Sequence, residues 1–139
     1  MRVLVACEYS GRVRDAYIAA GHEAISCDLL PTEVPGPHHQ GDIRDLLGEG
    51  FDLMVAHPPC THLAVSGSRW FKDKREEQLE ALEFVRLLLA APIPRIALEN
   101  PISIIFQQSQ ETRPNHPTLA IWTRRNQSYL LVAQEPSSP

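Results

Sequence analysis

Four short, mostly apolar runs, separated by polar turns and by segments of helical periodicity, limit the folds open to this chain. They span residues 2–6, 23–27, 52–56 and 95–98. Runs of this length, rich in Val, Leu, Ile and Ala, are typical of buried β-strands. Strands that alternate with helices predict a parallel sheet with helices on both faces.

The first helical segment follows the first run. We expect Ser10 to cap this helix and Gly21 to end it. Apolar residues recur at helical spacing, which predicts an inner face made of Val13, Ala16, Tyr17 and Ala20.

The second helical segment begins near Asp73 and Glu76, which resemble a capping box, and runs to about Ala91. Pro92 and Pro94 then stop it. Its predicted inner face consists of Ala81, Leu82, Val85, Leu88 and Leu89. Between the second and third strands we expect a loop over 31–40 and a short helix or edge element over 41–47.

Polar features cluster where the predicted strands end. Ligands of open parallel sheets bind beyond the carboxyl ends of the strands. The features at these ends are Glu8 to Gly11, Asp28, His57 to Cys60, and Glu99-Asn100. The sequence therefore predicts one site along this edge of the sheet.

Composition limits the number of domains, the partners and the cellular compartment that we expect for this chain. The chain has 139 residues, enough for one domain, and a net charge of −4 that is unlike a general polyanion binder. Three cysteines, no signal-peptide pattern and no apolar run of membrane length favour a reducing cytoplasm and no membrane. One basic patch could contact nucleic acid, or could be only a solvated helix start: Arg69, Lys72, Lys74 and Arg75.

Cys60 is the candidate nucleophile. It follows Pro58-Pro59 at the start of a loop, which holds a thiol clear of the sheet, and a loop over 60–70 with Ser66 would cover it. The alternative is a small buried hydrophobe, the role that we expect for Cys7 and Cys27.

Glu99 is the candidate partner of this nucleophile. A carboxyl pushed into an apolar cleft stays protonated near neutral pH and can donate a hydrogen bond to a ring nitrogen. The alternative is a solvated carboxylate at a strand end. This pairing suggests covalent chemistry on a pyrimidine base.

Three residues suit a nucleoside ligand in the same cleft. Gly11 allows a ligand to approach the backbone, Asp28 can accept hydrogen bonds from a ribose diol, and Asp42 can accept one from an adenine amino group. The alternatives are a turn role for Asp28 and an N-cap role for Asp42.

A zinc site is a further alternative. His57, Cys60 and His62, with His38 or His39, are suitable ligand types, although their spacing matches no common site. We expect no metal.

The order of these motifs resembles that of the DNA cytosine-5 methyltransferases, and more closely their short phage-type relatives, over residues 1 to about 105. The resemblance implies a Rossmann-like fold that uses S-adenosylmethionine, with Cys60 attacking C6 of cytosine and Glu99 contacting N3. It implies a cofactor site of Glu8, Ser10, Gly11, Asp28, Asp42 and Pro58, and substrate contacts from Asn100, Ser66 and Arg69. It also implies a phage- or prophage-encoded protein in the cytoplasm of a bacterial host.

Two features separate the chain from the large enzymes of that family. Thr61 follows the nucleophile where Gln is usual, and a target-recognition domain is absent. The substrate is therefore expected to be DNA, double- or single-stranded, or alternatively a free cytosine nucleotide. A third interpretation is an inactive module that binds only cofactor or partner.

Residues 106–139 form an atypical tail after the domain of residues 1–105. Codons that can encode Arg113 to Thr118, read one base later, lead into a Gln-Pro-Trp-x-x-Gly-His stretch like that of the phage-type relatives. This pattern predicts an out-of-frame tail and an incomplete sheet with an unpaired edge.

Overall fold

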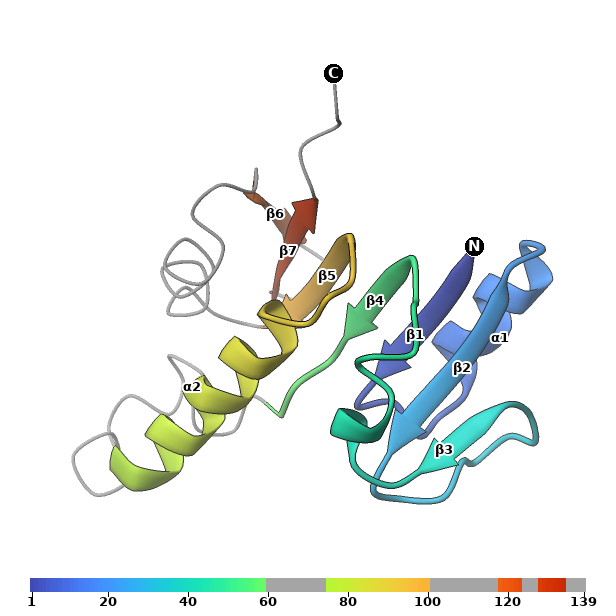
Figure 1. Cartoon of the computed structure of the whole chain (residues 1–139), viewed down its shortest axis with the longest axis horizontal. Coiled ribbons are helices and arrows are strands. Elements are labelled where there is room, and N and C mark those ends of the chain that lie inside the picture. The colour runs from blue at the N-terminus through green and yellow to red at the C-terminus, as the bar shows by residue number, and fades with distance from the viewer. Residues whose placement is uncertain (60–74, 101–117, 124–127, 135–139) are drawn as a thin grey trace.

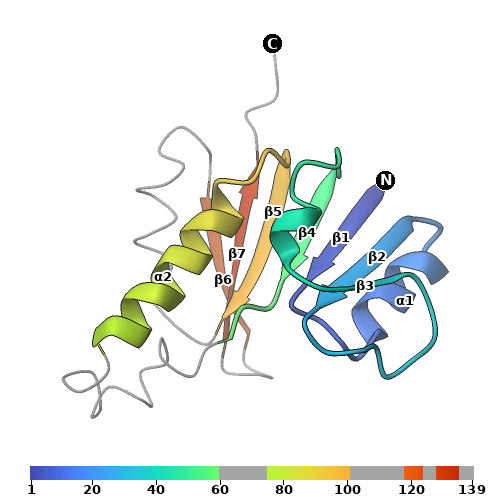
Figure 2. The ribbon, with the colours of Figure 1, turned by 60° about the horizontal axis from the view of Figure 1, so that its bottom comes forward.

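The computed structural model describes residues 1–59, 75–100, 118–123 and 128–134. Its centre is one seven-stranded sheet in the order β3-β2-β1-β4-β5-β7-β6 (Figure 2). The strands are β1 (Arg2–Ala6), β2 (Glu23–Asp28), β3 (His38–Gln40), β4 (Leu53–Ala56), β5 (Arg95–Asn100), β6 (Thr118–Thr123) and β7 (Ser128–Gln134). The helical elements are α1 (Arg12–Ala19), a 3₁₀ turn η1 (Ile43–Asp45) and α2 (Arg75–Leu89).

Every strand pair from β3 to β5 is parallel, and β7 runs antiparallel to both of its neighbours (Figure 1). The carboxyl ends of strands β1 to β5 therefore meet at one edge of the sheet, as the alternating pattern predicts. The four strands predicted from the apolar runs are present, with ends that differ by no more than two residues.

Alternate residues of the strands build two cores. Leu4, Met54, Ile96 and Leu98 point to the face that α2 covers, in the larger core, whereas Val3 and Val5 face α1. Helices thus cover both faces. The predicted inner face of α2 is confirmed: Val85, Leu88 and Leu89 are fully buried, and Ala81 and Leu82 pack against the same core.

The inner face of α1 differs from the prediction. Val13 and Tyr17 contact the smaller core, but Ala16 and Ala20 are exposed. Arg14 is the residue of this helix that is buried. Helical periodicity therefore predicts the helix correctly. It misses Arg14 on the inner face, because arginine is not counted as apolar.

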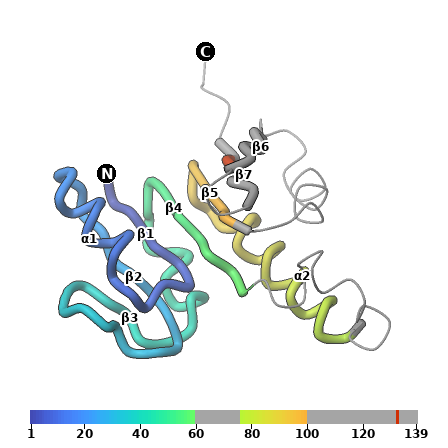
Figure 3. The backbone as a smooth tube through the Cα atoms, turned by 180° about the vertical axis from the view of Figure 1, so that it is seen from behind, coloured from blue at the N-terminus to red at the C-terminus, as the bar shows by residue number. Residues whose placement is uncertain are grey.

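The predicted loop over 31–40 is wrong at its end. His38–Gln40 forms β3, which pairs with β2 from Ser26↔His38 to Asp28↔Gln40 at the edge of the sheet. Two histidines and a glutamine carry no apolar signal, and the strand exists because β2 offers it a partner (Figure 3). The short element predicted over 41–47 is confirmed as η1.

The tail supplies two strands of the sheet. β7 pairs with β5 from Arg95↔Gln134 to Asn100↔Tyr129, and β6 pairs with β7. The edge that an out-of-frame tail would leave unpaired is thus occupied. The origin of residues 106–139 stays a prediction.

Candidate functional site

A cavity of about 360 Å³ opens at the carboxyl ends of β1, β2, β3 and β4. Pockets for small ligands occupy roughly 300–1,000 Å³, so this volume suits one. The lining residues are Cys7, Cys27, Asp28, Leu29, Gly41, Asp42, Ile43, Arg44, Pro59 and Phe84. The cavity lies where the sequence predicts a site, and two of the predicted cofactor residues, Asp28 and Asp42, line it.

Asp28 closes β2 and faces this cavity. One carboxylate oxygen, Oδ1, accepts a hydrogen bond from the amide of Leu30 at 2.9 Å, so the turn role expected as an alternative is present. The carbonyl oxygen of Asp28 accepts from Gly41 at 2.9 Å, which brings the loop after β3 against the end of β2. Within the described residues, Oδ2 has no hydrogen-bond partner, so it can accept one from a ligand.

Asp42 also carries out its alternative role, as the N-cap of η1. It accepts a hydrogen bond from the amide of Arg44 at 2.9 Å and pairs with the Arg44 guanidinium at 2.9 Å. The amide hydrogen bond and the adjacent positive charge lower the pKa of Asp42. The carboxylate is therefore ionised at neutral pH where it lines the cavity.

Two thiols form the floor of the cavity. Cys27 is buried, as predicted, but Cys7 is only half-buried, and its backbone is left-handed with φ 58°. Burial, with the nearby Asp28 carboxylate, raises the pKa of Cys7 to about 12 and that of Cys27 to about 11. Both remain protonated at neutral pH, so they act as weakly polar wall atoms rather than nucleophiles.

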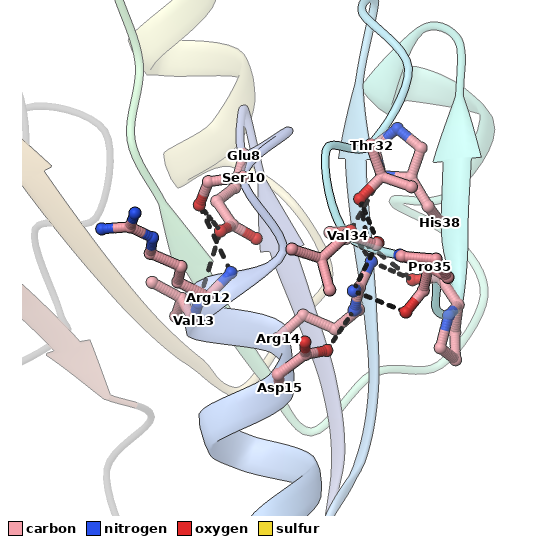
Figure 4. Close-up of polar contacts among 12 residues, drawn as sticks. Glu8, Ser10, Arg12, Val13, Arg14, Asp15, Thr32, Val34, Pro35 and His38 are labelled. Carbon is pink, nitrogen blue, oxygen red and sulfur yellow. Dashed lines mark hydrogen bonds and ion pairs between the residues drawn. The ribbon is translucent and has the colours of Figure 1, made fainter.

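The loop after β1 holds three of the predicted cofactor residues, Glu8, Ser10 and Gly11. Glu8 is only 7% exposed, and its Oε1 accepts hydrogen bonds from the Ser10 hydroxyl and from the Val13 amide (Figure 4). The prediction that Ser10 caps α1 is wrong: Gly11 is the N-cap, with φ 77°. Glu8, Ser10 and Gly11 are not among the residues that line the cavity.

The ends of β4 and β5 carry a second polar group of residues. His57 Nδ1 lies 3.2 Å from Glu99 Oε2, and the His57 amide donates to Ala6 at 3.0 Å. Glu99 is thus paired with an imidazole rather than set in a purely apolar cleft. His57 Nε2 is buried and has no partner among the described residues.

Several predicted site residues lie outside the described part of the chain. These are Cys60, His62, Ser66 and Arg69, together with the side chain of Asn100. Pro58 is buried, and Pro59 reaches the cavity. Within the described residues, no three potential ligands are grouped to hold a metal ion.

Arg14 was missed by the sequence analysis. Its side chain is fully buried and donates to Ser26 Oγ at 3.2 Å, Thr32 Oγ1 at 3.2 Å and the Val34 carbonyl at 3.0 Å (Figure 4). A Cβ at Gly36 would lie 2.6 Å from the guanidinium, so the loop packs directly on it. Arg14 thus holds the loop after β2, and the first residue of this loop, Leu29, lines the cavity. The signal in the sequence is a Pro-rich loop, whose backbone carbonyl groups need hydrogen-bond donors from elsewhere in the chain.

Comparison with solved structures identifies the fold. A TehB-like SAM-dependent methyltransferase from Corynebacterium glutamicum superposes with TM-score 0.53, at 14% identity, over 97% of this chain and 80% of its own. A release-factor-specific protein-glutamine methyltransferase from Alicyclobacillus acidocaldarius gives 0.58 at 17% identity, over 98% and 81%. A methyltransferase from Pyrococcus furiosus gives 0.58 at 12%, over 96% and 74%.

The fold is that of the S-adenosylmethionine-dependent methyltransferases. No protein-family model and no curated protein sequence matches the chain. The similar structures act on unlike acceptors, one of them on release factors and another on 16S rRNA. In the described residues, no helix is long and apolar enough to cross a membrane.

Proposed function

We propose that this chain is an S-adenosylmethionine-dependent methyltransferase whose cavity holds the cofactor. The observation that carries the proposal is the position of Asp28 and Asp42 on a cavity at the carboxyl ends of the strands of a methyltransferase fold. When bound, the cofactor supplies a methyl group on a positively charged sulfur.

The residues present fit this cofactor. Leu29, Ile43 and Phe84 offer apolar surface to an adenine ring. Asp28 Oδ2 would accept hydrogen bonds from the ribose hydroxyls, and the ionised Asp42 would attract the exocyclic amino group. The small side chains of Cys7 and Cys27, which also line the cavity, would leave room for the sugar.

We further propose that the methyl acceptor is C5 of cytosine in DNA. The Cys60 thiolate would add to C6, which makes C5 nucleophilic, while Glu99 holds N3. C5 then takes the methyl group, and loss of the C5 proton with expulsion of the thiolate restores the ring. The sequence motifs support this route, and His57 would orient Glu99 through the 3.2 Å contact.

A free cytosine nucleotide is the second candidate acceptor. The net charge of −4 favours a small substrate over a DNA duplex. A module that binds the cofactor without turnover is the third candidate.

Calorimetric titration of the full chain with S-adenosylmethionine tests the cofactor. We expect saturable binding, weakened about tenfold in Asp28→Asn, since a hydrogen bond to a charged group contributes about 1.5–3 kcal/mol. Glu49→Gln, which removes an exposed carboxylate near the opposite edge of the sheet, should bind as the wild type does. Absence of binding by folded wild-type protein would exclude the methyltransferase assignment.

Mass spectrometry with fluorinated substrates tests the acceptor. Fluorine at C5 blocks loss of that substituent, so a covalent adduct accumulates. An adduct with 5-fluorocytosine DNA that disappears in Cys60→Ser supports DNA, whereas an adduct with the fluorinated nucleotide alone supports the second candidate. Cofactor binding without either adduct supports the third.

A further inference from the structure

His57 is held at the end of β4 by its own backbone and by the two prolines after it. Its amide donates a hydrogen bond to the carbonyl of Ala6 at 3.0 Å, one step beyond the last pair of the β1–β4 ladder, Ala6↔Ala56. Pro58 is buried, and Pro59 lines the cavity. A proline has a fixed φ and no amide hydrogen, so this turn has little freedom. The imidazole therefore starts from a defined point at the carboxyl edge of the sheet.

One ring nitrogen of His57 is bound to a carboxylate from the neighbouring strand. β4 and β5 are parallel neighbours, and their last ladder pair is Ala56↔Leu98 (Figure 1). The residues that follow this pair, His57 and Glu99, are in contact, with Nδ1 lying 3.2 Å from Glu99 Oε2. An ionised carboxylate only accepts hydrogen bonds, so Nδ1 carries the proton in this pair. The neutral ring then has its lone pair on Nε2.

The other ring nitrogen, Nε2, is buried and has no hydrogen-bond partner among the described residues. Polar atoms in this state are rare in folded proteins, because a buried acceptor without a donor costs free energy. A proton donor placed beside Nε2 would recover that free energy. The geometry of His57 thus leaves one acceptor atom ready to take a proton.

The titratable groups beside His57 suit a transient positive charge on the ring. They are Glu99 on β5 and, just after β1, Cys7 and Glu8. Burial raises the pKa of Cys7 to about 12, so this thiol stays neutral. Of the two carboxyl groups, that of Glu99 makes the direct contact. A carboxylate at Nδ1 stabilises the imidazolium that forms when Nε2 takes a proton.

The proton donor that the chain offers is the thiol of Cys60. Cys60 lies outside the described residues, but it is bonded to Pro59 and follows His57 by three positions. Three residues of chain span at most about 11 Å between Cα atoms, so the two side chains belong to one short segment. The other thiols, Cys7 and Cys27, have pKa values raised to about 12 and about 11 and stay protonated. Of the three cysteines, Cys60 is therefore the one left for a nucleophilic role.

We propose that His57 is the general base that activates Cys60. Nε2 takes the thiol proton: the S–H bond breaks, its electron pair stays on sulfur, and an N–H bond forms. The product is a thiolate beside an imidazolium whose Nδ1–H is held by Glu99. The inference rests on the proposed function, because Cys60 is the nucleophile of that reaction. It goes beyond that function by making His57 the proton acceptor, in addition to its contact with Glu99.

The pH dependence of alkylation in the wild-type protein provides the first test. Iodoacetamide reacts with thiolates, and peptide mass spectrometry gives the rate at Cys60. An unassisted thiol such as N-acetylcysteine is a few per cent ionised at about pH 7 and mostly ionised at about pH 9.5, so its rate rises more than about twentyfold. We expect a rise of less than about threefold at Cys60, because His57 has already taken the proton. A rise as steep as that of N-acetylcysteine would overturn the proposal.

His57→Gln provides the second test, because glutamine can donate a hydrogen bond to Glu99 but cannot take a proton. The rate at Cys60 should fall about tenfold at about pH 7 and change less than about twofold at about pH 9.5, where the thiol ionises unaided. A purely structural role would lower both rates by the same factor. Retention of the wild-type rates in folded His57→Gln, or an equal loss at both pH values, would overturn the proposal.

His39→Gln is the matched control. His39 Nε2 forms a similar pair with Asp45 Oδ2 at 3.0 Å, but it lies on β3 and no cysteine follows it closely in the chain. This variant should keep the wild-type rates at Cys60 at both pH values. If His57→Gln does not fold, the comparison of wild-type Cys60 with N-acetylcysteine decides the role of His57.

These measurements involve neither cofactor nor methyl acceptor, so they separate this inference from the proposed function. Wild-type protein that does not bind S-adenosylmethionine would refute the proposed function, while the alkylation rates would still decide the role of His57. Cofactor binding together with a steep pH dependence at Cys60 would overturn the inference and leave the cofactor assignment standing.

Discussion

At the scale of single residues, three titratable side chains that line the cavity have defined ionisation states at neutral pH. Cys7 and Cys27 stay neutral because ionised thiols would be poorly solvated and close to Asp28. Asp42 stays ionised because Arg44 satisfies it. The cavity is thus lined by two neutral thiols and by the ionised Asp42 carboxylate.

The raised pKa values of the two thiols make stability depend on pH. Thiols of the unfolded chain ionise near their ordinary pKa of 9.0, whereas in the folded chain they ionise at about 12 and 11. The unfolded state therefore loses protons first, and the stability that is fully present below pH 9.0 is lost as pH rises through the folded values. Urea unfolding at about pH 8 and about pH 10.5 should show a larger loss in the wild type than in the Cys7→Ala/Cys27→Ala variant. Equal losses would contradict the upward direction of both shifts.

Arg14 should contribute more to stability than any exposed arginine of the same helix. Arg14→Met leaves the buried hydroxyl of Ser26, the half-buried hydroxyl of Thr32 and the carbonyl of Val34 without their donor. We expect a loss of about 1–3 kcal/mol in the free energy of unfolding, the cost of leaving a buried acceptor without its donor. Arg12→Met, at an exposed position, should change it by less than about 0.5 kcal/mol. Urea unfolding compares the two, and similar losses would show that the loop does not depend on Arg14.

At the scale of elements, the ends of helix α1 show which local signals are reliable. Gly21 follows the C-cap Ala20 with φ 88°, and the amides of Gly21 and His22 donate to the carbonyls of Ile18 and Tyr17. This is the Schellman arrangement that a glycine after an apolar period predicts. The N-terminus is different, since its capping anion comes from Glu8, outside the usual cap position.

The conformation of Gly21 gives a prediction at this scale. An added Cβ at Gly21 would have no heavy atom within 4 Å, so Gly21→Ala tests only its left-handed backbone. We expect a loss of about 1–2 kcal/mol, the cost of this conformation for a residue with a side chain. Gly48→Ala is the matched control, because its surroundings are equally open and its φ is not positive. It should be neutral or stabilise the chain slightly. Thermal unfolding measures both, and an equal response would contradict the argument from backbone conformation.

At the scale of the whole molecule, β7 decides whether the outer edge of β5 is paired or exposed. β7 lies between β5 and β6 and runs antiparallel to both. Without it, the amides of β5 would face solvent on that side. The tail of this chain thus supplies one internal strand of the sheet, β7, and one edge strand, β6.

A proline in β7 tests this arrangement. Leu131 pairs with Leu98 on one side and Ala120 on the other, so its amide faces a neighbouring strand whichever direction it points. Leu131→Pro removes that donor and should lower the free energy of unfolding by about 3 kcal/mol. Denaturant unfolding measures the change. Unaltered stability would show that the tail does not join the sheet, as expected of an out-of-frame segment.

The sequence by itself determined the parallel sheet, the two helices and the edge where the site lies, because apolar periodicity and helix ends are local properties. It also placed Asp28 at that edge, since residues after buried strands meet there. Only the tertiary structure decided that β3 is a strand, that Arg14 is buried, that His57 pairs with Glu99 and that Glu8 fills the end of α1. These depend on contacts between distant segments, in which a polar side chain is buried because a partner elsewhere in the chain satisfies it.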